Sequence, residues 1–346
     1  MTPPPLPPSL HGKRLALTGS GPTVYAYASL YESLDAQGLD GRPSPAAPAV
    51  PLLLVHSFSA GASALEMRPL FERYGAIRPT LAIDLPGFGR SQRGPLDYTP
   101  ALMAQAVLRA AHQLRAWKNA AAVDVLALSL SCEFVALAAL KQPSWFRSVA
   151  LVSPTGLESG LAERYQQGRS KDKPLLRRGL ASRWGAPVFR WLTTEAVMRS
   201  FMERAWGSSM IDEAQLASAR SSARRPGARP ALAAFAAGAL FTVGIADRYA
   251  QLAPPVWLAH GVRGGFANFG GLARIGPPRH WSHDTFGTGA LPHLETPDLF
   301  MARYDNFLGR VEDPASALAA AHAAPAFMAR VSTAWGPAAL QPSILR

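Results

Sequence analysis

Short apolar runs alternate along this chain with longer segments whose apolar residues are spaced as on helices. The apolar runs cover residues 51–55, 80–84, 123–128, 148–152 and 256–261. Runs of this kind are typical of parallel strands buried on both faces, and such strands are usually joined by crossover helices. The pattern therefore predicts an α/β protein with a mostly parallel central sheet flanked by helices.

The apolar run 123–128 passes directly through Ser129 into a segment predicted to be helical through Leu140. On so tight a strand-to-helix turn, a serine hydroxyl projects above the sheet, and the helix N-terminus stabilises negative charge that develops beside it. The turn needs small neighbours, and Ala127 and Ser131 stand where such elbows usually carry glycine. The competing interpretation is that Ser129 only caps the helix.

The alternation of strands and helices stops between residues 157 and 241. This segment has helical spacing, many arginines and five large aromatic residues: Trp184, Phe189, Trp191, Phe201 and Trp206. We interpret it as an inserted helical cap, because the strand pattern resumes after it. The prediction divides the chain into a proline-rich tail (1–14), a first part of the core (15–156), the cap (157–241), a second part of the core (242–309) and a C-terminal tail (310–346).

The charge balance of the 346-residue chain is strongly basic, with a formal net charge of +12. The excess is concentrated between Arg164 and Arg229 without a recognisable nucleic-acid-binding module, so a solvated basic face is favoured and no nucleic-acid partner is expected. The positive charge of the predicted cap is compatible with a weak contact with an anionic membrane surface. With a single cysteine, Cys132, and no signal-like N-terminus, a cytoplasmic protein is expected; the oligomeric state is left open.

Three elements together resemble the α/β-hydrolase superfamily: the elbow at Ser129, the sequence DLPGFGRS at 84–91 and the sequence LPHLE at 291–295. They occur in the order found in that family. The resemblance spans about residues 18 to 308, with the cap where the family usually inserts one. It implies the α/β-hydrolase fold and a serine nucleophile.

This resemblance also implies roles for individual residues. Ser129 would be the nucleophile, and His293 would be the general base that takes its proton and later returns it to the leaving group. The backbone N–H groups of Phe58 and Leu130 would form the oxyanion hole. Without the resemblance, His293 could merely cap the helix that follows it.

Of the two residues that precede Phe58, one differs from the family pattern. Ser57 stands where the family usually has glycine, which changes the geometry of the loop more than its chemistry. The preceding His56 is expected to be a structural histidine beneath that loop.

The catalytic acid is where this sequence departs most from the family. The acid usually follows the strand at 256–261, but its position falls on Gly264 or Gly265. Some members of the family carry the acid in the loop after the strand that follows the elbow, which here is the strand at 148–152. The candidates for orienting the histidine are Glu158 as a tentative acid, and Asn268 or Asp284 as alternatives; a dyad of serine and histidine alone is the remaining possibility.

We therefore predict a serine hydrolase that cleaves a carboxylic ester, or a related acyl compound, through an acyl-enzyme on Ser129. The aromatic cap predicts that this small-molecule substrate has an apolar portion. Carbon–carbon bond hydrolysis and lipase action belong to the same class and stay open. The alternative is a non-catalytic binding or scaffold protein with an incomplete triad.

No metal is expected, because His280 and His283 have no third ligand near them in the sequence. No cofactor is expected either.

Overall fold

The computed structural model describes residues 10–30, 49–157, 172–276, 278 and 280–313. In these residues a central sheet of eight strands has the order β1-β2-β4-β3-β5-β6-β7-β8. The strands are β1 (Lys13–Leu17), β2 (Val24–Ala28), β3 (Leu52–Val55), β4 (Thr80–Ile83), β5 (Val123–Leu128), β6 (Phe146–Val152), β7 (Val256–Gly261) and β8 (Trp281–Phe286). β2 is antiparallel to both of its neighbours, and all other neighbouring strands are parallel. The predicted mostly parallel sheet is confirmed.

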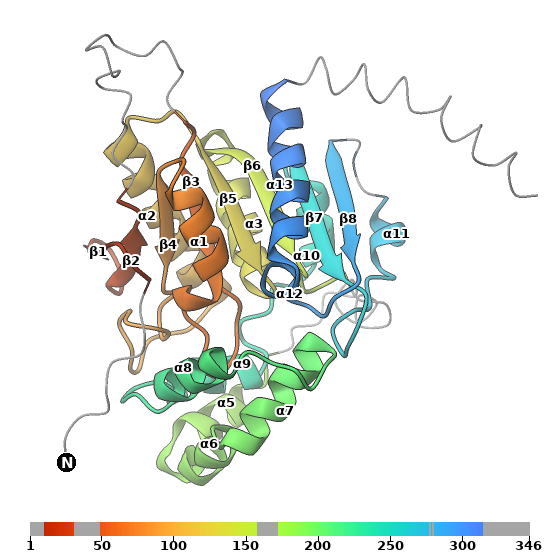
Figure 1. Ribbon diagram of the computed structural model, residues 1–346. Coiled ribbons are helices and arrows are strands. Elements are labelled where there is room, and N and C mark those ends of the chain that lie inside the picture. The colour runs from red at the N-terminus through yellow and green to blue at the C-terminus, as the bar shows by residue number, and fades with distance from the viewer. Residues whose placement is uncertain (1–9, 31–48, 158–171, 277, 279, 314–346) are drawn as a thin grey trace, which may run out of the picture.

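Helices cover both faces of this sheet (Figure 1). One face carries α1 (Arg68–Gly75) and α13 (Pro297–Glu312); the other carries α2 (Pro100–Lys118), α3 (Ser131–Lys141) and α10 (Ile245–Ala250). Successive residues of a strand point to opposite faces. Accordingly, Leu53 and Val55 belong to the core under α2 and α3, whereas Leu52 and Leu54 belong to the core under α1 and α13. Both faces of β3 are therefore buried, which explains its unbroken apolar sequence.

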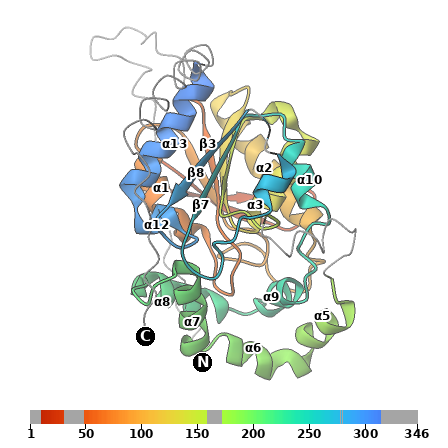
Figure 2. The same cartoon turned by 90° about the vertical axis from the view of Figure 1, so that its right-hand side faces the viewer.

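Five helices between β6 and β7 form a layer beyond the ends of the parallel strands (Figures 1 and 2). They are α5 (Pro174–Ala181), α6 (Ala186–Leu192), α7 (Glu195–Trp206), α8 (Glu213–Ala223) and α9 (Arg229–Ala236). All five fall inside the segment predicted to be a cap, although the boundaries of that segment stay a prediction. The described residues also contain short helical segments: η2 (Ala64–Met67), η3 (Pro143–Trp145), η4 (Arg183–Gly185), α11 (Leu272–Ile275) and α12 (Pro292–Glu295).

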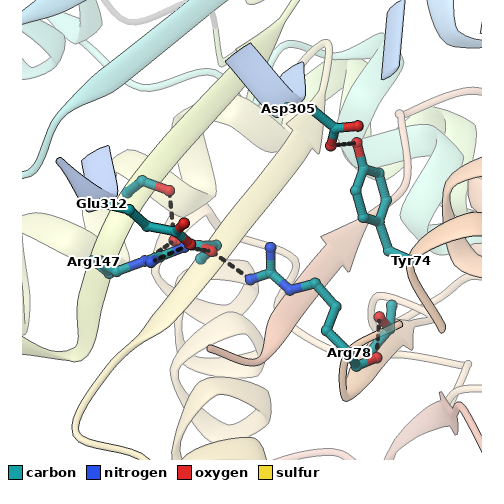
Figure 3. Close-up of polar contacts among 8 residues, drawn as sticks. Tyr74, Arg78, Arg147, Asp305 and Glu312 are labelled. Atoms are coloured by element: carbon teal, nitrogen blue, oxygen red, sulfur yellow. Dashed lines mark hydrogen bonds and ion pairs between the residues drawn. The ribbon is translucent and has the colours of Figure 1, made fainter. Parts of the chain in front are cut away.

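A buried ionic network holds the end of the sheet that lies away from the cap. The carboxylate of Asp124, near the start of β5, is fully buried and is contacted by Arg78 and by Arg147, whose Nε lies 2.9 Å from it. Arg147 also reaches Glu312 of α13 at 3.1 Å (Figure 3). Ser129 follows β5 five residues later, about 16 Å along an extended strand. The network is thus a structural feature of the opposite end of the sheet.

The described part of the chain contains no helix that is both long and apolar enough to cross a membrane.

Candidate active site

The turn between β5 and α3 holds Ser129 in the left-handed region of backbone conformation, with φ of 53°. This conformation is uncommon for a residue with a side chain, and such strain is concentrated at functional sites. The Ser129 N–H donates to the carbonyl of Val152 in β6 at 2.8 Å, which anchors the turn to the sheet. Ala127 and Ser131 on either side are fully buried, so larger side chains would not fit there. The side chain of Ser129 itself is half-buried.

The backbone next to Ser129 offers two unused hydrogen-bond donors. Within the described residues, neither the N–H of Leu130 nor the N–H of Phe58 donates a hydrogen bond. The neighbouring Ser57 N–H is instead engaged by the Glu66 carboxylate at 2.9 Å. Buried backbone donors are almost always paired, so two free ones in the loops after β3 and β5 are what an oxyanion hole requires.

The loop after β3 is held from below by His56. The amide of Leu85 donates to His56 Nε2 at 3.0 Å, so Nδ1 carries the proton and donates to the carbonyl of Ser57 at 2.6 Å. The ring is fully buried. These contacts give His56 a structural role and leave it no part in proton transfer.

The predicted base, His293, lies in α12 and is fully buried. Its Nε2 lies 3.0 Å from the backbone carbonyl of Glu66. Because a carbonyl only accepts, Nε2 carries the proton in this contact, and Nδ1 has no hydrogen-bond partner among the described residues. Burial lowers the pKa of His293 to about 4, so the ring is neutral at pH 7 and able to accept a proton.

The structure does not join Ser129 to His293 by a hydrogen bond. No partner for the Ser129 hydroxyl is found within the described residues, and the hydrogen bond of the His293 ring goes to Glu66. Hydrogen bonds between catalytic groups are often formed only when a substrate is bound. The assignment of these two residues as nucleophile and base therefore stays a prediction.

The usual position of the acid, after β7, is occupied by the end of cap helix α7. Gly264 has φ of +84°, and a Cβ there would lie 2.6 Å from the carbonyl oxygen of Arg204. The N–H of Gly265 donates to the same oxygen at 3.1 Å. Glycine is needed at Gly264 because the helix backbone passes so close, whereas a Cβ at Gly265 would meet mainly the side chain of Arg204. The close backbone gives a physical reason why no carboxylate stands at Gly264.

Of the three predicted partners of the histidine, two lie within the described residues, and neither is hydrogen-bonded to its ring. Glu158 is outside them. The side-chain oxygen of Asn268, which is exposed, accepts from the Gly270 N–H at 3.2 Å. Asp284, in β8, accepts from Trp257 Nε1 at 2.8 Å and lies 3.8 Å from Arg303. Neither described candidate contacts His293, and their roles remain untested.

Two carboxylates at the site were missed by the sequence analysis. Glu66 contacts the loop after β3, the predicted oxyanion loop, through its side chain and contacts His293 through its backbone; burial raises the pKa of its carboxyl. No motif marks it. Glu133, in the first turn of α3, accepts from the hydroxyl of Thr155 at 2.5 Å and from the N–H of Thr242 at 2.6 Å. A glutamate inside an otherwise apolar helix was the signal that could have found it.

The residue after β6 is also unusual. Ser153 follows Val152, which pairs with Leu128, so Ser153 and Ser129 come at equivalent ends of adjacent parallel strands. Like Ser129, it has a positive φ, 46°, and its buried hydroxyl has no partner among the described residues. A carboxylate moved to the end of this strand would stand at this position.

Aromatic rings from the core and the cap meet around Phe58, in the predicted oxyanion loop. The ring of Phe58 lies 4.3 Å from that of Phe88, 5.3 Å from that of Phe235 in α9 and 6.0 Å from that of Phe134, measured between centroids. Phe235 in turn stacks on Phe241 at 5.8 Å. The surroundings of the site are therefore apolar, and the cap contributes to them.

The described residues contain no group of three or more histidine, cysteine, aspartate or glutamate side chains suited to an ion. The nearest approach is His260 and His283, whose Nε2 atoms lie 2.9 Å apart. At that distance one ring donates to the other, so the two nitrogens bind each other.

Together, the strand order and the left-handed serine between β5 and α3 describe an α/β protein with the predicted nucleophile on a tight strand-to-helix turn. The chain belongs to the alpha/beta hydrolase family, whose model matches residues 52–303. No curated protein matches it significantly in sequence.

Solved structures share the fold at low identity. The chain is similar to a serine hydrolase involved in carbazole degradation, the CarC enzyme (13% identity, TM-score 0.63, 86% of this chain and 98% of that one covered). It is also similar to carboxylesterase CesB from Bacillus subtilis (13%, TM-score 0.59, 86% and 92%). A third is 2-hydroxy-6-oxo-6-phenylhexa-2,4-dienoate hydrolase from a Rhodococcus species (16%, TM-score 0.62, 87% and 99%).

Proposed function

We propose that this protein is a serine hydrolase that cleaves a carboxylic ester, or a related acyl compound, through an acyl-enzyme on Ser129. The observation that carries the proposal is the strained conformation of Ser129 beside the free N–H groups of Phe58 and Leu130. A serine that only capped α3 would need neither the left-handed conformation nor two unused donors from two loops.

The reaction would run through the groups of this site. Ser129 Oγ attacks the substrate carbonyl carbon while His293, which is neutral, takes the hydroxyl proton. The N–H groups of Phe58 and Leu130 stabilise the negative charge on the carbonyl oxygen. His293 then protonates the departing alcohol, and a water molecule releases the acyl group by the same steps. For this, the ring must release the carbonyl of Glu66 and move its proton from Nε2 to Nδ1, so that Nε2 can accept from the hydroxyl of Ser129.

The apolar surroundings favour a substrate with an apolar portion. Phe58, Phe88 and Phe235 bring rings from two core loops and from the cap to the oxyanion loop. Structural relatives are named as a carboxylesterase and as a hydrolase of a phenyl-bearing dienoate, and the second name describes a substrate with an apolar group. We therefore favour a small ester with an aromatic or aliphatic group.

Labelling with a fluorophosphonate probe tests the proposal. The wild type should label, and Ser129→Ala should abolish labelling, because the probe reacts only with an activated serine. His293→Ala should slow labelling by two orders of magnitude or more, roughly the contribution of a general base. Ser131→Ala is the matched control, since this buried serine lies on the same turn and should not matter.

A non-catalytic binding or scaffold protein is the second candidate, and one observation favours it. The end of α7 fills the acid position, and the hydrogen bond of His293 is directed to the Glu66 carbonyl. In this alternative, the protein keeps the fold but lacks a complete catalytic triad. Folded wild-type protein that fails to label, and that hydrolyses none of a panel of short and long p-nitrophenyl esters, would support it.

A further inference from the structure

The tip of the cap carries large apolar side chains that point into solvent. Within α5, η4 and α6 the exposed fractions are 85% for Leu175, 43% for Leu176, 76% for Trp184, 42% for Val188 and 62% for Trp191. Isolated exposed apolar residues are ordinary, but five within seventeen residues form a patch. We call the exposed surface of residues 173–191 the cap-tip face.

This face is not needed to hold the cap together. The opposite side of the same helices already packs on α9: Leu180, Phe189 and Leu192 line a small apolar gap with Leu232, Ala233 and Ala236. A surface helix normally buries one apolar stripe and exposes a polar one. Here the second side is apolar as well, so the outer residues have a role other than packing the fold.

The charges around the patch are mostly positive. Within the described residues, carboxylates are found there only beside Arg177 of α5, which lies 3.8 Å from Asp97 and 3.7 Å from Asp172. Lys173, Arg178, Arg183 and Arg190 are exposed, and residues 173–194 contain no acidic residue. None of these four cations forms an ion pair within the described residues, and the Arg183 guanidinium lies 5.0 Å from the ring of Trp184.

The adjoining helices carry acidic residues among their arginines. Two of these arginines are paired with glutamates: Arg199 with Glu213 at 2.6 Å and Arg220 with Glu195 at 2.5 Å. The cap-tip face differs in combining exposed tryptophan and leucine with four exposed cations that form no ion pair among the described residues.

The arrangement of the helices leaves this face accessible. Both views place α5 and α6 at the end of the molecule away from the sheet (Figures 1 and 2). A flat or convex partner could therefore reach the face without displacing any described element.

We propose that the cap-tip face docks on an anionic lipid surface. Trp184, Trp191 and Leu175 would enter the boundary between headgroups and acyl chains, where tryptophan is favoured, while the surrounding lysine and arginines would contact the anionic headgroups. A second copy of the chain is a poorer occupant, because pairing two such faces would bring together four unpaired cations from each copy. The proposal goes beyond the hydrolytic function and does not depend on it.

Vesicle co-sedimentation tests the proposal with the full chain. The wild type should bind vesicles of phosphatidylcholine mixed with phosphatidylglycerol more tightly than vesicles of phosphatidylcholine alone, and added salt should weaken the binding. The double variant Arg183→Gln/Arg190→Gln should bind the anionic vesicles more than tenfold more weakly, at about fivefold per charge. The double variant Trp184→Ser/Trp191→Ser should lose binding by at least as much.

The matched control is Trp117→Ser. Trp117 is 39% exposed on α2, and the ammonium of Lys118 lies 4.2 Å from its ring, so it is a tryptophan beside a cation outside the cap. This variant should bind vesicles as the wild type does, and so should Ser129→Ala, which separates lipid binding from catalysis. Equal binding to both kinds of vesicle, or equal losses with Trp117→Ser, would overturn the proposal. So would sedimentation velocity showing dimers that dissociate in Trp184→Ser/Trp191→Ser without vesicle binding by the wild type.

Discussion

His293 Nε2 lies 3.0 Å from the backbone carbonyl of Glu66, in a fully buried site. The contact fixes the tautomer of the ring and ties α12, after the last strand, to η2, after β3. Since the Glu66 carboxylate also holds the amide of Ser57, one residue links the predicted base to the predicted oxyanion loop.

The stability of the protein should depend on pH through His293. Its pKa is about 4 in the fold, against 6.5 for the free side chain. Between these values the unfolded chain binds a proton that the folded chain does not, so stability falls as pH drops from about 6.5 to about 4. The loss amounts to about 3 kcal/mol. Urea unfolding of wild type and His293→Gln across this range measures it.

The glutamine variant is chosen because its amide can still donate to the Glu66 carbonyl. Its stability should change less with pH than that of the wild type, and the difference between the two curves isolates His293 from the other histidines. Parallel curves would show that the ring titrates normally.

Glu66→Ala should slow the labelling of Ser129 by roughly tenfold to a hundredfold, because the Ser57 amide loses its acceptor and the loop bearing the Phe58 donor loosens. Glu66→Gln keeps an acceptor oxygen of the same shape and should retain most of the rate. The second-order rate constant for fluorophosphonate labelling measures both. If Glu66→Gln is as slow as Glu66→Ala, the charge of the carboxylate matters and not the hydrogen bond alone.

Ser153→Asp should raise the labelling rate by about tenfold or more, by placing a carboxylate at the end of β6 that supports the protonated form of His293. The left-handed backbone at this position suits aspartate better than serine. Ser153→Asn, of the same shape but without charge, is the control. An equal rate for Asp and Asn would mean that the carboxylate does not reach the histidine.

Gly264→Ala should destabilise the protein by about 2 kcal/mol or more, because left-handed strain adds to the collision with the Arg204 carbonyl. Gly276→Ala is the matched control: Gly276 also has a positive φ, +54°, but no described residue lies within 4 Å of its Cβ position. It should lose only about 1 kcal/mol. Thermal unfolding compares them, and equal losses would contradict the close packing of α7 on this loop.

Asp124→Ala should destabilise the fold by about 3–5 kcal/mol, since it leaves Arg78 and Arg147 partly buried without their carboxylate. The labelling rate of the protein that remains folded should not change, because the network lies at the other end of β5. Denaturant unfolding and labelling of the same sample separate the two effects. A labelling defect in fully folded variant protein would connect the network to the site.

Local patterns in the sequence were enough for most of the core. Unbroken apolar runs predicted the inner parallel strands, since burial on both faces leaves no other composition, and the loss of alternation predicted the helical insertion. The edge strand β8 was not predicted, because Trp281–Phe286 has only its last residue buried and its polar side chains give no apolar run. The elbow was visible because a serine between an apolar strand and an apolar helix is a local feature.

The sequence by itself thus determined the class of fold, the family and the position of the strained serine, because each depends on residues that are neighbours in the chain. Only the tertiary structure decided what surrounds them. It brought the backbone of Glu66 to His293, 227 positions away in the chain. It placed the end of α7 against the loop after β7, where the acid usually stands. It also left Trp184 and Trp191 exposed to solvent instead of over the site. Contacts of this kind depend on how helices and loops pack in space, and no local spacing records them.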